Sequence, residues 1–300
     1  MQEIIKGIYI ENSYLGVTLG AINLDHGLIL VDAPPRVEDS RSWRATLANL
    51  GGGVDRLLVN LDSHVDRTLG ARAMECTIVA HEKTAQVFRN RPTTFKAQSG
   101  ETGAEWEQIS GLGSVRWAPP ELTFTNRLCI NWSGSPLILE HHTGPNPGAI
   151  WIDYPAVKVL FVGDLVMHDQ PPFLANADLP AWIESLQALL SSAYQEYILI
   201  SGRGGVVMVS DVKAQLFYIQ EIKSQLEELA ERKAPPEATE EMALFEHLQL
   251  TQKSPAGSVA AVGPSLAYVY ADMPGALAGA AAGSRPRNRP LAGSYWRARR

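Results

Sequence analysis

Residues 62–67, DSHVDR, place several charged or metal-binding side chains directly after the apolar run LLVNL. Asp62, His64 and Asp66 alternate, and Arg67 follows at once. Carboxylate oxygens and imidazole nitrogens are common ligands of catalytic metal ions, which make bound water nucleophilic. Arginine keeps its proton at any working pH, so it donates hydrogen bonds and cannot ligate a cation. The stretch could therefore be a metal site, the remains of one, or a loop that happens to be polar.

The elements that must position these side chains can be read from apolar runs and turn residues. Runs bounded by Gly, Pro or Asp predict strands at residues 4–11, 14–24, 26–35, 55–61 and 76–82. Apolar residues at helical spacing predict helices over residues 39–52, 68–75 and 83–90. The polar stretch at 62–67 thus follows the end of a buried strand.

The second half of the chain repeats this order of strands followed by helices. We expect a meander of strands over 115–143, a hairpin over 148–167 that turns at 154–157, and a strand at 197–202. Helices are predicted over 178–193, with Asp178 as the cap, and over 210–234, opened by Ser210 or Asp211. Two successive sets of strands and helices favour an α+β fold, a four-layer αβ/βα sandwich.

The amino-acid composition of the chain changes after Pro235. This change predicts one domain over residues 1–234 and a C-terminal extension over 235–300. Residues 237–250 are a helix candidate. From about Ser254 the sequence is rich in Ala, Gly, Pro and Ser, a composition typical of a linker or disordered tail. Its aromatic residues leave room for a docking segment; they are Tyr268, Tyr270, Tyr295 and Trp296.

Charge and composition restrict the possible partners. The last sixteen residues hold six arginines and no acid, which leaves residues 1–284 with a net charge of −12. Such an acidic body does not suit a nucleic-acid groove, although the basic tail could contact nucleic acid or an acidic protein. Two separated cysteines indicate a reducing compartment, and we find no signal peptide and no apolar run long enough for a membrane. We expect a soluble cytoplasmic protein, which could form a homodimer.

Several segments, in order, resemble the metallo-β-lactamase-fold hydrolases between residues 3 and 225. LILVDAPP is similar to the early strand that ends in Asp, and LLVNLDSHVDRTLG to the strand and loop that carry the H-x-H-x-D-H metal motif. HHTGPNPG resembles the loop of the third histidine, LFVGDLV the strand that delivers a bridging Asp, and ILISGRGG the strand before the last histidine. The resemblance implies the same four-layer fold and, in the family, two zinc ions that share a hydroxide.

The resemblance also indicates which ligands this chain keeps. The residues that match the family pattern are His64, Asp66 and Asp164. The residues that depart from it are Asp62, Arg67, Pro145 or Asn146, and Arg203. Both arginines stand where histidines would complete the second metal site, so the chain resembles a divergent member with a degenerate motif. We do not expect dinuclear zinc.

The remaining donors define what a cofactor could use. Asp62, His64 and Asp164, with Asn146 as a weak carbonyl donor, could hold one divalent ion (Mn, Fe or Zn) or none. His141 and His142 precede the altered loop; one of them could swing in, or both could end a strand, one exposed and one packed. His168 could contact a ligand at the rim of the site or be a solvated loop residue.

The arginines have two possible roles. Buried near each other without a metal, Asp66 and Asp164 would be uncompensated anions, and Arg67 and Arg203 would supply the missing positive charge. Alternatively, their guanidinium groups face outward and hold a small anion such as phosphate or carboxylate. Asp66, Arg67 and Arg203 are therefore our candidate catalytic residues. Asp32, at a strand end before two prolines, is expected to cap a turn.

Three functional hypotheses follow, and the sequence leaves open whether the chain is an enzyme. The first is a non-catalytic or weakly active protein that binds a small anionic molecule or a protein partner. The second is a hydrolase of an ester, thioester, lactone or phosphodiester that uses at most one metal ion, with an arginine stabilising the oxyanion. The third is an interaction module that works through the C-terminal helix and basic tail.

Overall fold

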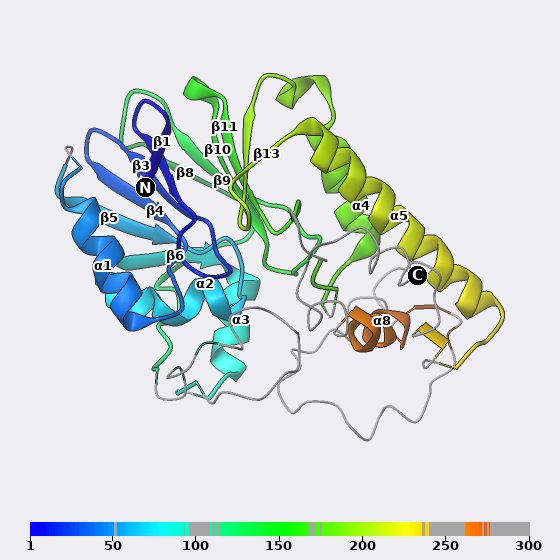
Figure 1. Ribbon diagram of the computed structural model, residues 1–300. Coiled ribbons are helices and arrows are strands. Elements are labelled where there is room, and N and C mark those ends of the chain that lie inside the picture. The colour runs from blue at the N-terminus through cyan, green and yellow to red at the C-terminus, as the bar shows by residue number, and fades with distance from the viewer. Residues whose placement is uncertain are drawn as a thin grey trace.

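The protein is described by a computed structural model in which two mixed sheets pack face to face between helices (Figure 1). The structure describes residues 1–50, 53–92, 94–95, 109, 112, 115–167, 172–174, 176–235, 238–239, 262–271, 273–274 and 276. The predicted four-layer αβ/βα sandwich is confirmed. The helix candidate at 237–250 lies outside the described residues, apart from 238–239. No helix in the described ranges is long and apolar enough to cross a bilayer.

The first sheet has seven strands in sequence order, from β1 to β7. They are β1 (Gln2–Ile5), β2 (Ile8–Glu11), β3 (Leu19–Asn23), β4 (Gly27–Val31), β5 (Asp55–Val59), β6 (Thr77–His81) and β7 (Leu122–Phe124). Strands β1 to β4 pair antiparallel, whereas β4 to β7 pair parallel. Gly7 has a φ of +81° and makes a turn, so the single strand predicted over 4–11 is wrong and two strands form instead.

The second sheet has six strands in the order β13-β12-β11-β10-β9-β8. They are β8 (Arg127–Ile130), β9 (Leu137–His141), β10 (Ile150–Tyr154), β11 (Val159–Gly163), β12 (Ile198–Ser201) and β13 (Val206–Val207). Only the β11–β12 pair is parallel among them. The predicted hairpin is confirmed as β10 and β11, joined by the short helix η4 (Pro155–Val157).

Helices cover the outer face of each sheet (Figure 1). On the first sheet they are α1 (Val37–Leu47), α2 (Val65–Thr68), η1 (Leu69–Met74) and α3 (Glu82–Asn90); on the second, α4 (Leu179–Leu189), η5 (Ser192–Tyr194) and α5 (Val209–Glu231). Asp178 caps α4 as predicted, because its carboxylate accepts the Ala181 N–H at 3.0 Å. Helix α5 begins one to two residues before the predicted cap, and Asp211 instead accepts the Met208 N–H at 2.7 Å.

Three of the four apolar cores formed by the described residues hold the sheets and helices together. Ile22, Val59 and Phe161 belong to the core between the two sheets. A second core, which includes Trp43, packs α1 and η1 against the first sheet, and a third, which includes Trp182, packs α4 and α5 against the second. Burying a large apolar side chain contributes roughly 1.5–3 kcal/mol, so these cores fix the relative positions of the sheets and of the loops at their ends.

A further helix, α8 (Val262–Ala271), forms where the composition predicts a linker or disordered tail. Leu266 and Tyr270 join the core around α4 and α5, and the Tyr270 hydroxyl donates to the carbonyls of Leu229 and Ala234 at 3.1 and 2.7 Å. These contacts satisfy carbonyls at and just after the end of α5. The prediction of a disordered tail is therefore wrong for residues 262–271, while the division of the chain at residue 234 stays a prediction.

Candidate metal centre

The centre is assembled from loops that follow parallel strands. Strands β4 and β5 run in parallel with Val31 beside Val59, so Asp32 and the loop that starts at residue 60 leave the first sheet at the same edge. Strands β11 and β12 pair Gly163 with Ser201, which places Asp164 and Arg203 together at an edge of the second sheet. The carboxyl ends of parallel strands meet at one edge, and ligand sites form there.

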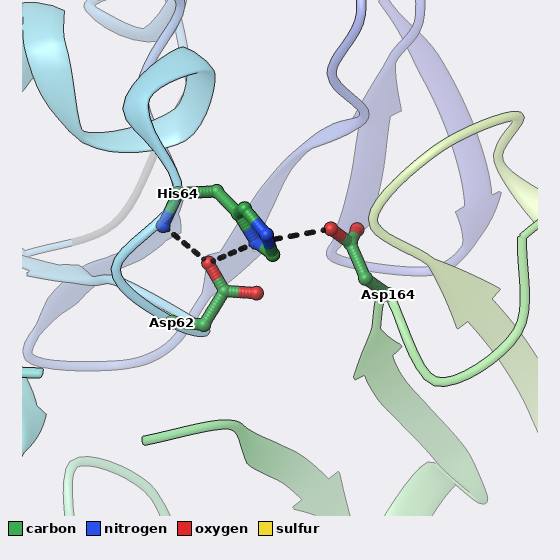
Figure 2. Close-up of side chains that lie close together, drawn as sticks. All are labelled: Asp62, His64 and Asp164. Atoms are coloured by element: carbon green, nitrogen blue, oxygen red, sulfur yellow. Dashed lines mark hydrogen bonds and ion pairs between the residues drawn. The ribbon is translucent and has the colours of Figure 1, made fainter. Parts of the chain in front are cut away.

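Asp62, His64 and Asp164 form a compact group of possible metal ligands, with one ligand atom from each within 4.8 Å of the others. The His64 Nδ1 atom lies 3.0 Å from Asp62 Oδ1 and 3.3 Å from Asp164 Oδ2, so the imidazole sits between the two carboxylates (Figure 2). Asp62 Oδ1 also accepts the His64 backbone N–H at 2.8 Å. Asp62 and Asp164 are buried, whereas the His64 side chain keeps 21% of its exposure.

Arg67 lies on the other side of these carboxylates and is fully buried. Helix α2 is one turn long and directs Asp66 and Arg67 inward. The Arg67 Nη2 atom donates to Asp164 Oδ1, and Nη1 lies 3.3 Å from Asp62 Oδ2 and 3.4 Å from Asp32 Oδ2. A single guanidinium group therefore contacts three buried carboxylates from three different strand ends.

Arg203 completes the arrangement with 3% exposure. Its Nη1 lies 2.5 Å from Asp66 Oδ2, and its Nε lies 3.2 Å from Asp164 Oδ1. We refer to Asp32, Asp62, His64, Asp66, Arg67, Asp164 and Arg203 together as the central cluster. Both guanidinium groups are buried and directed at carboxylates, so the expectation that they face outward toward an external anion is wrong for this conformation.

Electrostatics in the central cluster follow from burial and charge count. Four buried carboxylates face two guanidinium groups, which leaves two negative charges when His64 is neutral. Burial raises the pKa of Asp32 to about 7, although Arg67 opposes the shift. Burial alone would lower the pKa of His64, but the charges of Asp62 and Asp164 outweigh it and raise that pKa. Protons on Asp32 and His64 are thus the means by which the cluster approaches neutrality.

Asp66 shows the opposite balance. Burial would raise its pKa, but the Arg203 guanidinium outweighs burial and lowers it. Asp66 is therefore an anion at neutral pH, held by a permanent cation. Breaking a buried ion pair of this kind strongly destabilises the folded state, because either partner alone would be an uncompensated buried charge.

Among the described residues, one group is suited to hold a metal ion. A second ion would need ligands where Arg67 and Arg203 lie, and those guanidinium groups already neutralise Asp66 and Asp164. A Cβ at Gly202 would lie only 2.7 Å from Arg67 Nη2, so the space beside Asp164 is filled by the arginine. By contrast, two oxygens and one imidazole nitrogen of Asp62, His64 and Asp164 form a donor set that one divalent ion accepts.

The candidate ligands from the altered loop are occupied elsewhere. The Asn146 carbonyl oxygen accepts the Gly148 N–H at 3.0 Å, and its amide donates to the Ser63 hydroxyl at 3.1 Å. Asn146 thus joins its own loop to the loop of the central cluster. His168 lies outside the described residues.

His141 and His142 are not members of the three-residue ligand group. The His141 ring stacks on His81 at 3.8 Å, and the His142 ring stacks on Trp151 at 3.5 Å. Both are half-buried, so the expectation of one exposed and one packed residue is wrong. The strand-end part of the same expectation holds for His141, the last residue of β9, and His142 follows directly after that strand.

The contacts of two residues at the centre were not predicted from the sequence. Asp32 was expected only to cap a turn; it accepts the Leu61 N–H at 3.0 Å and also lies beside Arg67. Its place at the end of a strand parallel to β5 was a usable signal. Phe173 packs on His64, with ring centroids 5.3 Å apart, and lies 4.6 Å from the Arg203 guanidinium. Nothing in its sequence context indicated this contact.

Comparisons with known proteins agree with this architecture. The family model described as the metallo-beta-lactamase superfamily matches residues 63–201. A metallo-beta-lactamase from Pontibacter korlensis superposes with a TM-score of 0.57 and 20% identity, covering 73% of this chain and 97% of that one. A metallo beta lactamase from Erythrobacter litoralis gives a TM-score of 0.55 and 16% identity, covering 73% and 95%. Among curated proteins, no sequence matches this chain significantly.

A longer protein covers more of this chain. The stereoselective inverting sec-alkylsulfatase Pisa1 from Pseudomonas sp. superposes with a TM-score of 0.59 and 17% identity over 95% of this chain. This chain spans about half, 51%, of the length of that sulfatase. The fold, the matched family model and the position of the cluster agree: the chain has the metallo-β-lactamase fold, and residues 63–201 resemble the metallo-β-lactamase superfamily in sequence.

Proposed function

We propose that this chain is a metallo-β-lactamase-fold protein whose centre is neutralised by arginines in place of a metal pair. In this proposal it is non-catalytic or weakly active. The observation that carries the proposal is the pairing of Arg67 and Arg203 with Asp164 and Asp66, all of them buried. The family's hydrolytic chemistry uses a hydroxide shared by two metal ions, and a permanent cation occupies the place of one of them.

The proposed ligand is a small anionic molecule or a protein partner. Because both guanidinium groups are buried beside the carboxylates, an anion approaching the centre meets His64, the member that remains partly exposed. The raised pKa of His64 gives its imidazole a positive charge over more of the physiological range, which favours such an anion. The four carboxylates oppose it, so we expect weak binding that salt reduces.

A second candidate function is a hydrolase of an ester, thioester, lactone or phosphodiester with one metal ion. The observation in its favour is the convergence of Asp62, His64 and Asp164 within 4.8 Å. These three residues would hold the ion, which would polarise the substrate and lower the pKa of a bound water. Arg67 pairs with Asp62 and Asp164 and would hold both carboxylates in place beside the ion.

Turnover separates the two candidates. Purified protein is assayed on esters, thioesters, lactones and phosphodiesters, with and without added manganese, iron or zinc. Our first proposal predicts no metal-dependent turnover above that of the matched variants His64→Ala and His26→Ala. His26 is an exposed histidine and serves as the control. Metal-dependent turnover that His64→Ala abolishes and His26→Ala leaves intact would establish the one-metal hydrolase instead.

A further inference from the structure

Arg203 contacts more than the carboxylates of the central cluster. Its Nη1 also donates to the carbonyl of Gly16, and its guanidinium lies 4.6 Å from the ring centroid of Phe173. Gly16 belongs to the loop between β2 and β3, and Phe173 follows β11 by ten residues. One buried side chain therefore joins a loop of the first sheet, a segment of the second sheet and the cluster itself.

The loop of residues 12–18, which we call the β2–β3 loop, is attached to the second sheet around Arg203. The Thr18 N–H donates to the Gly202 carbonyl at 2.8 Å, and the Gly205 N–H donates to the Thr18 hydroxyl at 3.0 Å. Toward its tip the loop faces water, with Leu15 47% exposed. The hydrogen bonds described between this loop and the second sheet thus all go to residues 202, 203 and 205.

We propose that Arg203 is a latch that holds the β2–β3 loop closed over the central cluster. The guanidinium is planar and rigid, so its contacts with Asp66 and Asp164 fix the direction in which Nη1 meets Gly16. Closure of the β2–β3 loop and pairing of Arg203 with Asp66 and Asp164 therefore occur together. Loss of the arginine pairing therefore loosens the loop, which the two hydrogen bonds of Thr18 then hold alone, and release of the loop exposes Asp66 and Asp164 to water.

This latch does not depend on whether the protein is an enzyme. A ligand of either candidate function would have to wait for the β2–β3 loop to open, or approach beside His64 and Phe173. Local opening of this kind has its own free energy, lower than that of global unfolding, and amide hydrogen exchange measures it. The proposal can thus be tested without a known ligand.

The experiment compares amide exchange in the full chain for the wild type and four variants. Arg203→Lys keeps the positive charge but lacks the planar guanidinium group. Arg203→Met removes both the charge and the guanidinium group. Thr18→Val removes one loop contact and leaves the cluster untouched, while Arg127→Met replaces an exposed arginine of β8 as the control. Peptides covering residues 12–18 report the latch, and peptides covering β12 report the sheet beneath it.

We expect exchange in residues 12–18 to accelerate about tenfold or more in Arg203→Lys, because a charge-assisted hydrogen bond is lost, and about threefold in Thr18→Val. Exchange in β12 stays at the wild-type rate in both, and Arg127→Met changes neither. If Arg203→Met does not fold, Arg203→Lys and Thr18→Val decide. The latch is excluded if residues 12–18 exchange freely in the wild type, if Arg203→Lys leaves them unchanged, or if β12 accelerates equally.

Discussion

The two sides of the central cluster differ in what the same fold does with buried carboxylates. On the His64 side, Asp62, His64 and Asp164 converge as possible metal ligands, and the imidazole is partly exposed. On the arginine side, Asp66, Arg67 and Arg203 are all buried and paired. Asp164 belongs to both sides, because one of its oxygens faces His64 and the other faces the arginines.

This difference indicates two ways in which the same fold can compensate buried carboxylates. A carboxylate buried at a strand end needs a positive charge close by, and the source of that charge is free to vary. A guanidinium group supplies it permanently, at the cost of a coordination position. The His64 side could accept a metal ion instead, since the cation that it carries is an imidazole that can give up its proton.

The largest expected effect comes from removing Arg67. Arg67→Met leaves Asp164, Asp62 and Asp32 without their shared cation, and breaking a buried pair costs about 3–5 kcal/mol. Urea unfolding measures the loss, with Arg127→Met as the exposed control. If Arg67→Met were as stable as this control, the arginine side would not hold the fold together, and the comparison of the two sides would fail.

A smaller effect is expected from adding one methyl group at Gly202. In Gly202→Ala the new Cβ would lie 2.7 Å from Arg67 Nη2 and 2.9 Å from Asp164 Oδ1, and overpacking of this kind costs about 1–3 kcal/mol. Gly134→Ala is the matched control, because nothing lies within 4 Å of its Cβ. Combining Gly202→Ala with Arg67→Met should reduce the cost of the methyl group. Simple additivity of the two changes would show that Arg67 does not fill that space.

The pH dependence of stability should report the protons of the cluster. The pKa of Asp32 is raised to about 7, above that of an unfolded Asp, so the folded state binds this proton more tightly. The stability from this proton is full below the unfolded value and is lost as the pH rises through about 7, with a slope of up to about 1.4 kcal/mol per pH unit. The raised pKa of His64 acts in the same direction above its unfolded value.

Asp32→Asn isolates this contribution. Asn tolerates the φ of +59° that Asp32 adopts, and its carbonyl can still accept the Leu61 N–H. Urea unfolding between pH 5 and about 8 should therefore show a shallower decline in the variant than in the wild type. An identical slope in both proteins would mean that Asp32 carries no proton in the folded state.

Sequence reasoning found the fold because several weak segments agree in order. Apolar runs and turn residues identified β4, β5, β6 and β11, and a parallel strand end predicts where polar side chains gather. It also placed Arg67 and Arg203 near Asp66 and Asp164, because the family resemblance supplied their positions. The role of each of these residues stays a prediction.

The missing parts depend on packing between segments far apart in the chain. The Arg203–Gly16 contact spans 187 residues and involves a backbone carbonyl, which any residue type provides. The two described ring contacts of Phe173 are with His64 and Arg203, which lie in other segments of the chain. Helix α8 was missed because its composition is poor in charged and polar helix formers, and its tertiary contacts through Leu266 and Tyr270 outweigh that signal.

Metal content after saturation tests the central claim most directly. The protein is incubated with excess zinc, dialysed against metal-free buffer, and analysed by inductively coupled plasma mass spectrometry, with His64→Ala beside it. The account predicts no more than one zinc ion per chain, and none in the variant, because guanidinium groups fill the rest of the centre. Two tightly held zinc ions per wild-type chain would contradict it.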